Sequence, residues 1–295
     1  MKTRSTSTGT PLVESFFDTN THTVSHVVID QSTNQVAIID SVLDYEPHAA
    51  KTSFASADKI ISFIKENNYQ VQWLIETHAH ADHLSAAPYL QSKLGGKLAI
   101  NAKIKVVQEV FGKIFNFGTE FARDASQFDH LFQDNEKFKL GNIDAHIIYT
   151  PGHTPADSTV IIGDAAFVGD TMFMPDFGTA RCDFPGGSAE TLYNSIQRIY
   201  QLPDQTRLFM CHDYLPAGRT EFAWETTVAQ QKAHNIHVAT NKDKQSFIET
   251  RTNRDKTLGM PRLIIPSIQV NINAGKLPAK EDNGTSYLKI PIDKF

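Results

Sequence analysis

The sequence predicts an α/β protein in which apolar strands alternate with amphipathic helices. Residues 71–76 are apolar and rich in β-branched and aromatic side chains, which indicates a buried strand. On either side of it, residues 56–68 and 84–94 space their apolar side chains as one face of a helix does. A helix between strands is the βαβ pattern of an α/β layer. A chain of 295 residues is long enough to bury a large core in that architecture.

The N-terminal part is expected to form antiparallel strands joined by polar turns. Residues 1–11 are rich in Ser and Thr and are predicted to be a flexible end, with a single domain over residues 12–295. Residues 26–30 and 35–40 are β-branched runs that flank a polar turn, and so they predict a hairpin. Asp40 closes the second run, where it would either accept hydrogen bonds beside a metal site or lie at the surface.

The first turns of the two predicted helices can also be located. Ser56 or Asp58 could cap the helix over residues 56–68. Pro88 is tolerated only in a first turn, so the helix that ends at Leu94 is expected to begin near Ser85.

Composition narrows the class of protein. Hydrophobic residues make up 40% and charged residues 21%, with a net charge of -5, a pI of about 6.2 and a mean hydropathy of -0.31. These values are typical of a soluble globular protein and argue against non-specific binding of nucleic acid. No apolar run approaches the roughly 18 residues of a membrane span. The two cysteines, Cys182 and Cys211, are too few for a disulfide framework, so we expect a reducing compartment, the cytoplasm.

A dense group of metal-binding side chains follows the strand at residues 71–76. Within six residues the chain places His78, His80, Asp82 and His83 at a turn between strand and helix. Neutral imidazole suits zinc, iron, copper and nickel, and a carboxylate adds the negative charge that holds a divalent ion. The turn therefore predicts a metal site beyond the end of a sheet.

Three more apolar strands end in the same kind of side chain. His153 follows the strand at 147–149 after a Pro-Gly turn, Asp170 follows a strand and a glycine, and His212 follows the strand at 208–210. Because ligands in open α/β sheets bind beyond strand ends, we expect these side chains to meet at one site.

In order and type these residues match the metallo-β-lactamase superfamily. His78, His80, Asp82 and His83 resemble its HxHxDH turn, and the later ligands resemble its remaining metal positions. The resemblance covers roughly residues 12–275 and implies an αββα sandwich.

Two enzyme branches of that superfamily compete for this chain. One resembles the glutathione persulfide dioxygenases, which implies a mononuclear Fe(II) held by His78, His153 and Asp170 and the oxidation of a persulfide by O₂ to sulfite and free thiol. Four further groups would then orient ligands and water or hold a second metal: His80, Asp82, His83 and His212.

The other branch resembles glyoxalase II, a binuclear thioester hydrolase that uses all seven residues and zinc. Thr154-Pro155-Ala156-Asp157 lacks the Gly-His that follows this turn in many hydrolases, which disfavours that branch. A non-catalytic metal-binding interaction protein is a third hypothesis, and the open ligand set argues against it.

Three further segments resemble sequence motifs of the dioxygenases. Residues 178–184 resemble their Gly-x-x-Arg-x-Asp-Phe segment, and residues 212–214 their His-Asp-Tyr. Residues 260–263 resemble Asn-Pro-Arg-Leu, although Met260 departs from it. The resemblance implies that glutathione carboxylates are held by Arg181, Tyr214 and Arg262. Each arginine could instead form an ordinary surface ion pair.

Residues 103–132 are expected to form a helical, aromatic insert. It would be a lid or channel wall, ordinary core, or a surface between two copies of the chain, so a homo-oligomer is an open alternative. In the C-terminal tail, residues 287–292 read as a short strand.

Further helices are predicted at residues 224–234 and 242–256, with His234 and His237 as surface residues. We interpret Cys182 as a structural thiol rather than a redox-active one.

Overall fold

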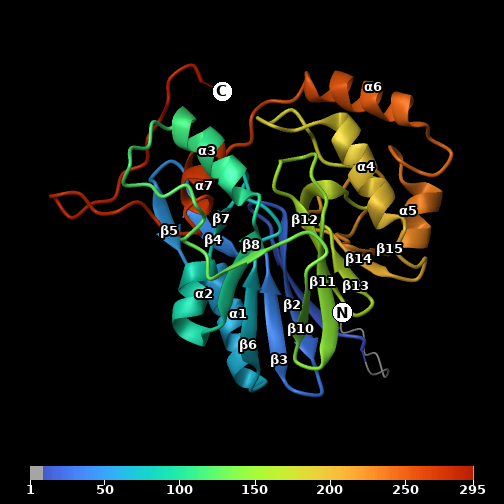
Figure 1. Ribbon diagram of the computed structural model, residues 1–295, viewed down its shortest axis with the longest axis horizontal. Coiled ribbons are helices and arrows are strands. Elements are labelled where there is room, and N and C mark those ends of the chain that lie inside the picture. Colours follow the sequence, from blue (N-terminus) through green and yellow to red (C-terminus); the bar gives the residue numbers. More distant parts are fainter. Residues whose placement is uncertain (1–8, 295) are drawn as a thin grey trace.

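Two six-stranded sheets pack face to face, with helices on both outer sides (Figure 1). The computed structural model describes residues 9–294, so most of the end predicted to be flexible, residues 1–8, lies outside the described residues.

The first sheet is antiparallel at one edge and parallel across the rest, in the order β1-β2-β3-β6-β8-β9. The predicted hairpin joins β2 to β3, with Asn34 at a φ of 58° in its turn. The strands are β1 (Leu12–Asp18), β2 (Thr23–Asp30), β3 (Gln35–Ile39), β6 (Gln70–Ile75), β8 (Lys97–Asn101) and β9 (His130–Phe132).

The second sheet runs in chain order, antiparallel except for one parallel pair, β13 with β14. Its strands are β10 (Lys137–Leu140), β11 (Ile143–Tyr149), β12 (Ser158–Ile162), β13 (Ala165–Phe167), β14 (Arg207–Phe209) and β15 (Glu225–Thr227). A small third sheet joins β5 (Lys51–Ser53), β4 (Val42–Glu46) and β7 (Leu84–Ser85).

The helices fall into two groups that cover opposite sides of the sheet pair (Figure 1). One side carries α1 (Ala55–Glu66), α2 (Ala87–Leu94), α3 (Ile104–Ile114) and α7 (Ile264–Asn271). The other carries α4 (Ala189–Ile199), α5 (Val228–His234) and α6 (Lys244–Asp255), and a single turn, η1 (Gly169–Thr171), follows β13. One apolar cluster fills the space between the sheets and another lies under each helical layer, which confirms the αββα sandwich.

The start of α1 agrees with the prediction but its predicted cap was wrong, and α2 and α5 begin a few residues later than predicted, because long-range contacts override local preference. The first residues of α1 are not capped by a side chain of its own N-terminus; Asp44 of β4 accepts from the backbone N–H and the hydroxyl of Ser56 instead. Leu84 and Ser85 pair with β4, so α2 begins at Ala87, with Pro88 in its first turn. Likewise residues 225–227 pair with β14 before α5 begins.

The insert contains α3 and then an aromatic loop that leads to β9. Phe111, Phe115 and Phe128 are buried in the core beneath it, so these rings serve packing. The tail at residues 287–292 is not a strand: the side-chain amide of Gln269 bonds both the N–H and the C=O of Lys289 and so takes the place of a neighbouring strand. Within residues 9–294 no helix has the length and apolar character needed to cross a membrane.

Candidate metal centre

The metal-binding turn is fixed by Asp40, which stands at the end of β3 beside the end of β6. Its buried carboxylate accepts from the backbone N–H of Thr77 (2.8 Å), from the Thr77 hydroxyl (2.9 Å) and from Nε2 of His80 (3.0 Å). Parallel pairing of β3 with β6 brings these segments together. Asp40 therefore orients the metal turn and does not lie at the surface, which settles the two alternatives left open by the sequence.

His80 lies between two carboxylates. Its Nε2 is 3.0 Å from Asp40 and 3.1 Å from Glu76, which also accepts from the hydroxyl of Ser85. Burial alone would lower the pKa of His80, but the two carboxylates outweigh it and raise that pKa well above its usual value. The other ring nitrogen, Nδ1, is buried and has no hydrogen-bond partner among the described side chains and backbone.

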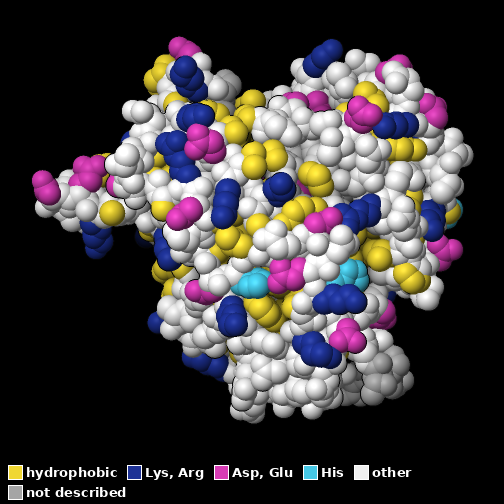
Figure 2. All heavy atoms as spheres, viewed as in Figure 1, with side chains coloured by type: hydrophobic (Ala, Val, Ile, Leu, Met, Phe, Trp, Pro, Cys, Tyr) yellow, Lys and Arg dark blue, Asp and Glu magenta, His cyan; other side chains and the backbone are white. Residues whose placement is uncertain are grey.

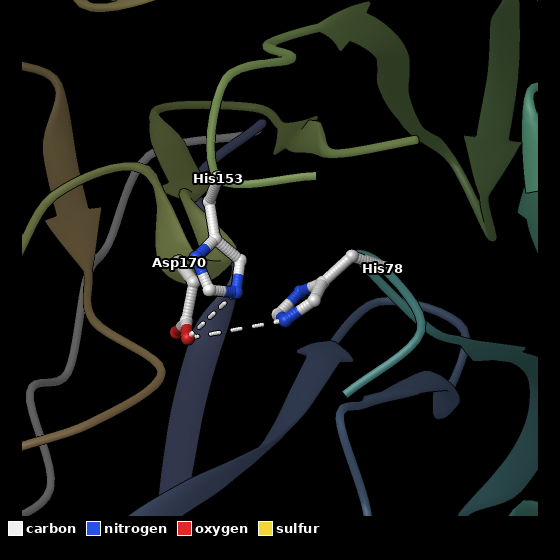
Figure 3. A group of neighbouring side chains, drawn as sticks. All are labelled: His78, His153 and Asp170. Carbon is white, nitrogen blue, oxygen red and sulfur yellow. Dashed lines mark ion pairs between the residues drawn. The ribbon is translucent and has the colours of Figure 1, made fainter. Parts of the chain in front are cut away.

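His78, His153 and Asp170 converge from three strand ends (Figure 3). Nε2 of His78 lies 3.9 Å from Oδ2 of Asp170, and Nε2 of His153 lies 3.6 Å from the same oxygen. The ligand atoms of the three lie within 4.8 Å of one another. This distance is short enough for one ion to contact all three, as in a site of two histidines and one carboxylate.

Hydrogen bonds at the far nitrogens turn both imidazoles toward that point. Nδ1 of His153 donates to the carbonyl of Arg181 (2.8 Å), and Nδ1 of His78 contacts the Thr77 hydroxyl at 3.0 Å. Burial, with neighbouring histidines, lowers the pKa of His78 well below its usual value, so the ring is neutral. Among the described residues Nε2 of His78 and Oδ1 of Asp170 are buried without a hydrogen-bond partner, which fits a bound metal ion.

A second group lies on the other side of Asp170. Nε2 of His212 is 3.1 Å from Oδ2 of Asp82 and 3.3 Å from Oδ1 of Asp170, and the rings of His83 and His80 contact each other at a tilt of 37°. Nε2 of His212, Nε2 of His83 and Oδ2 of Asp82 have no hydrogen-bond partner within residues 9–294. The ligand atoms of His80, Asp82 and His83 lie within 4.8 Å of one another, as do those of Asp170, Cys211 and His212, so either group could hold a second ion.

A pocket of about 340 Å³ opens onto the metal-binding groups. His153, Asp170 and Asp82 lie in its lining, and its walls are aromatic: Phe173, Phe177, Phe184 and Tyr214. The Tyr214 residue is 37% exposed, but desolvation of its hydroxyl in the pocket, together with the negative charges of Asp82 and Asp170, raises its pKa well above the usual value, so the hydroxyl is a hydrogen-bond donor.

The two arginines predicted to bind substrate, Arg181 and Arg262, both line the pocket, but they differ in how many of their N–H donors are already hydrogen-bonded. Arg181 forms two hydrogen bonds to Asp183 (2.6 and 2.7 Å) and one to the carbonyl of Gly259 (2.6 Å), so most of its donors are occupied. Arg262 makes one long contact, 3.4 Å, to the carbonyl of Asn20. Arg181 therefore shapes the wall, whereas Arg262 keeps donors for a ligand.

Sequence reasoning missed Arg254 and misplaced His237. Arg254 lines the pocket from α6, and none of the described carboxylates forms an ion pair with it. Its helix was predicted, but helical spacing alone does not tell which residue reaches a pocket built by other segments. His237 was expected at the surface, whereas it is half-buried and accepts from the backbone N–H of Thr179 (3.1 Å), beneath the loop of Arg181.

Comparison with known proteins identifies the family. The family model of the metallo-beta-lactamase superfamily matches residues 18–212, which span the strands and turns that carry the ligands. The chain belongs to the metallo-β-lactamase superfamily.

Relatives within the superfamily carry different names. The chain is 50% identical over 291 residues to a probable metallo-hydrolase of Burkholderia pseudomallei, covering 95% of this chain and 99% of that one. It is 50% identical to glyoxylase B2 of Dictyostelium discoideum over 283 residues, covering 95% and 97%. The mitochondrial persulfide dioxygenase ETHE1 of Bos taurus is 26% identical over 213 residues, 71% of each chain.

Among solved structures, ETHE1 from Myxococcus xanthus is similar with a TM-score of 0.71 and 26% identity. The match covers 90% of this chain and 99% of that one. The chain therefore has the fold of a metallo-β-lactamase superfamily enzyme. Its His and Asp clusters can hold a metal ion, as is typical of that superfamily.

Proposed function

We propose that the protein is a persulfide dioxygenase that uses a mononuclear non-haem Fe(II) and acts on glutathione persulfide or a related persulfide. The persulfide, O₂ and water would give the free thiol and sulfite. The observation that carries this proposal is the group of two histidines and one carboxylate, His78, His153 and Asp170, of which His153 and Asp170 line the pocket. Three protein ligands leave coordination positions for both O₂ and a substrate sulfur.

When bound, Fe(II) supplies the one-electron chemistry that O₂ needs and brings the two reactants together. The side chains of the protein supply the ligands, the exclusion of water and a hydrogen-bond donor. His78 is a neutral donor because burial lowers its pKa, and Asp170 balances part of the ion's charge. Phe173 and Phe177 exclude water from the reacting sulfur, and the Tyr214 hydroxyl can donate a hydrogen bond to an anionic sulfur or oxygen.

The pocket suits a small anionic thiol. Arg254 and Arg262 lie in its lining and can pair with the carboxylates of a peptide such as glutathione. A volume of about 340 Å³ is within the range of small-molecule sites. On the face shown in Figure 2, Lys and Arg are interspersed with Asp and Glu, consistent with a small-molecule partner rather than nucleic acid. The names of the ETHE1 relatives support the same choice.

A thioester hydrolase with two zinc ions is the second candidate. Two further groups of the described residues favour it, because either could hold a second metal ion: His80 with Asp82 and His83, and Asp170 with Cys211 and His212. The name of the Dictyostelium relative also points to this branch.

Metal analysis combined with an oxygen electrode distinguishes the two. We expect close to one iron per chain and O₂ uptake that depends on glutathione persulfide. Two zinc ions per chain, hydrolysis of lactoylglutathione and no O₂ uptake would refute the dioxygenase and support the hydrolase. Bound metal with neither activity would favour the third hypothesis, a non-catalytic metal-binding protein.

A further inference from the structure

The loop at residues 178–183 connects the metal centre to α6. The carbonyl of Arg181 in this loop accepts the hydrogen bond from Nδ1 of His153 (2.8 Å). A histidine that donates from Nδ1 presents the lone pair of Nε2, and it is Nε2 of His153 that faces Asp170. The position of this one carbonyl therefore controls both the tautomer and the aim of a predicted metal ligand.

Two buried charges of α6 hold that loop on either side of Arg181. Arg251 donates from Nη1 to the carbonyl of Thr179 (3.1 Å). Asp255 accepts from the backbone N–H of Cys182 (2.9 Å) and from its thiol (3.3 Å). Burial raises the pKa of Cys182 to about 12, so the thiol stays protonated and can donate.

Arg251 and Asp255 also pair with each other one helical turn apart, and their side chains are only 2% and 3% exposed. A buried ion pair contributes little net stability compared with apolar residues of similar size. The pair is thus better explained by what it holds than by the stability it adds. Through the Cys182 N–H it holds the peptide group that contains the Arg181 carbonyl itself, and through the Thr179 carbonyl it holds the peptide group that joins Thr179 to Ala180.

We propose that Arg251 and Asp255 are positioning residues that set the orientation of His153 through the 178–183 loop. The inference rests on the proposed metal role of His153 and is independent of which reaction the centre performs. The path is short: Asp255 to the Cys182 N–H, the adjoining Arg181 carbonyl, and then His153. His237 also holds this loop, because its Nδ1 accepts a hydrogen bond from the backbone N–H of Thr179.

The test uses zinc alone as the probe and a double variant, Arg251→Met with Asp255→Leu. This variant removes both charges together, so no buried charge is left unpaired and the fold is expected to survive. The matched control is Glu190→Leu with Lys244→Met, which removes the ion pair between α4 and α6 (2.8 Å) that does not touch the loop. Unfolding by urea, zinc affinity by competition with a chelator and long-range ¹⁵N correlation spectra of histidine are measured for each protein.

We expect the double variant to unfold near the wild-type urea concentration but to bind zinc about tenfold more weakly or worse. Its His153 signal is expected to show a mixture of tautomers, whereas the control keeps the wild-type affinity and a single Nδ1–H form. Wild-type zinc affinity with an unchanged His153 signal in the folded double variant would overturn the proposal.

If the double variant does not fold, the neutral pair Arg251→Gln with Asp255→Asn decides. It also leaves no buried charge unpaired, but the Cys182 N–H and the Thr179 carbonyl both lose their charged partners. We expect a loss of zinc affinity of about threefold or more, smaller than for Arg251→Met with Asp255→Leu. Wild-type zinc affinity in this folded neutral pair would refute the positioning role. None of these measurements depends on persulfide oxidation, so failure here and failure of the proposed function are separate results.

Discussion

Replacing Asp40 with asparagine tests how the metal turn is held. The carboxylate accepts from two groups of Thr77 and from Nε2 of His80, all at 3.0 Å or less and all buried. Burial by itself would raise the pKa of Asp40, but His80 and the Thr77 donors outweigh it and lower the pKa below its usual value. The carboxylate is thus charged at neutral pH. Asp40→Asn would remove that charge and turn an N–H₂ group toward at least one donor.

The expected losses of stability and of metal affinity in Asp40→Asn follow from these contacts. A hydrogen bond to a charged group contributes about 1.5–3 kcal/mol, and a buried pair that loses one partner costs about 3–5 kcal/mol. Glu76 still pairs with His80, so we expect the lower part of this range, a loss of roughly 3 kcal/mol in the free energy of unfolding. Because His78 and His80 lie on the same turn, metal affinity should fall by about 10- to 100-fold.

The assay compares urea unfolding and metal competition for Asp40→Asn and for a matched variant, Asp30→Asn. Asp30 closes β2 as Asp40 closes β3, and it accepts from Ser32, Thr33 and the backbone of Asn142, away from the metal centre. Both variants should be less stable, but only Asp40→Asn should lose metal affinity. Equal loss of affinity in both, or wild-type affinity in Asp40→Asn, would show that Asp40 does not orient the turn.

Three further outcomes are expected. Asp170→Ala should abolish metal binding as measured by elemental analysis of the purified protein, since Asp170 faces both ligand groups; retained stoichiometric metal would remove it from the centre. Arg254→Gln should raise KM for a glutathione-based substrate about fivefold, near the 1 kcal/mol of an exposed ion pair, with kcat unchanged; an unaltered KM would exclude it from the substrate site. Burial lowers the pKa of His26 to about 4 from 6.5, so the unfolded chain binds more protons below pH 6.5, and stability falls as the pH drops from 6.5 to 4. His26 alone should account for about 3 kcal/mol of that fall, and His26→Gln should flatten the curve whereas His48→Gln, at an exposed site, should not.

Patterns in the amino-acid sequence predicted the α/β class and the place of the candidate metal site, whereas the αββα sandwich was implied by the resemblance to the superfamily. Alternating apolar runs predict strands from local composition, and a histidine or aspartate that directly follows such a run must lie at a strand end. His78, His153 and Asp170 could therefore be predicted to meet, because strand ends on one side of paired sheets lie together. These inferences need only short-range patterns and the general geometry of sheets.

The orientation of each group depends on how the elements pack. Asp40 and Glu76 fix which nitrogen of His80 is bonded, and Asp44 supplies a helix cap from a strand. Arg181 is occupied by Asp183, whereas no carboxylate within residues 9–294 pairs with Arg254. Most of these facts depend on contacts between segments far apart in the chain, and the helical spacing of Arg254 does not show which way it faces. Local propensity carries no information about such contacts, so a side chain's partners appear only once the elements have packed.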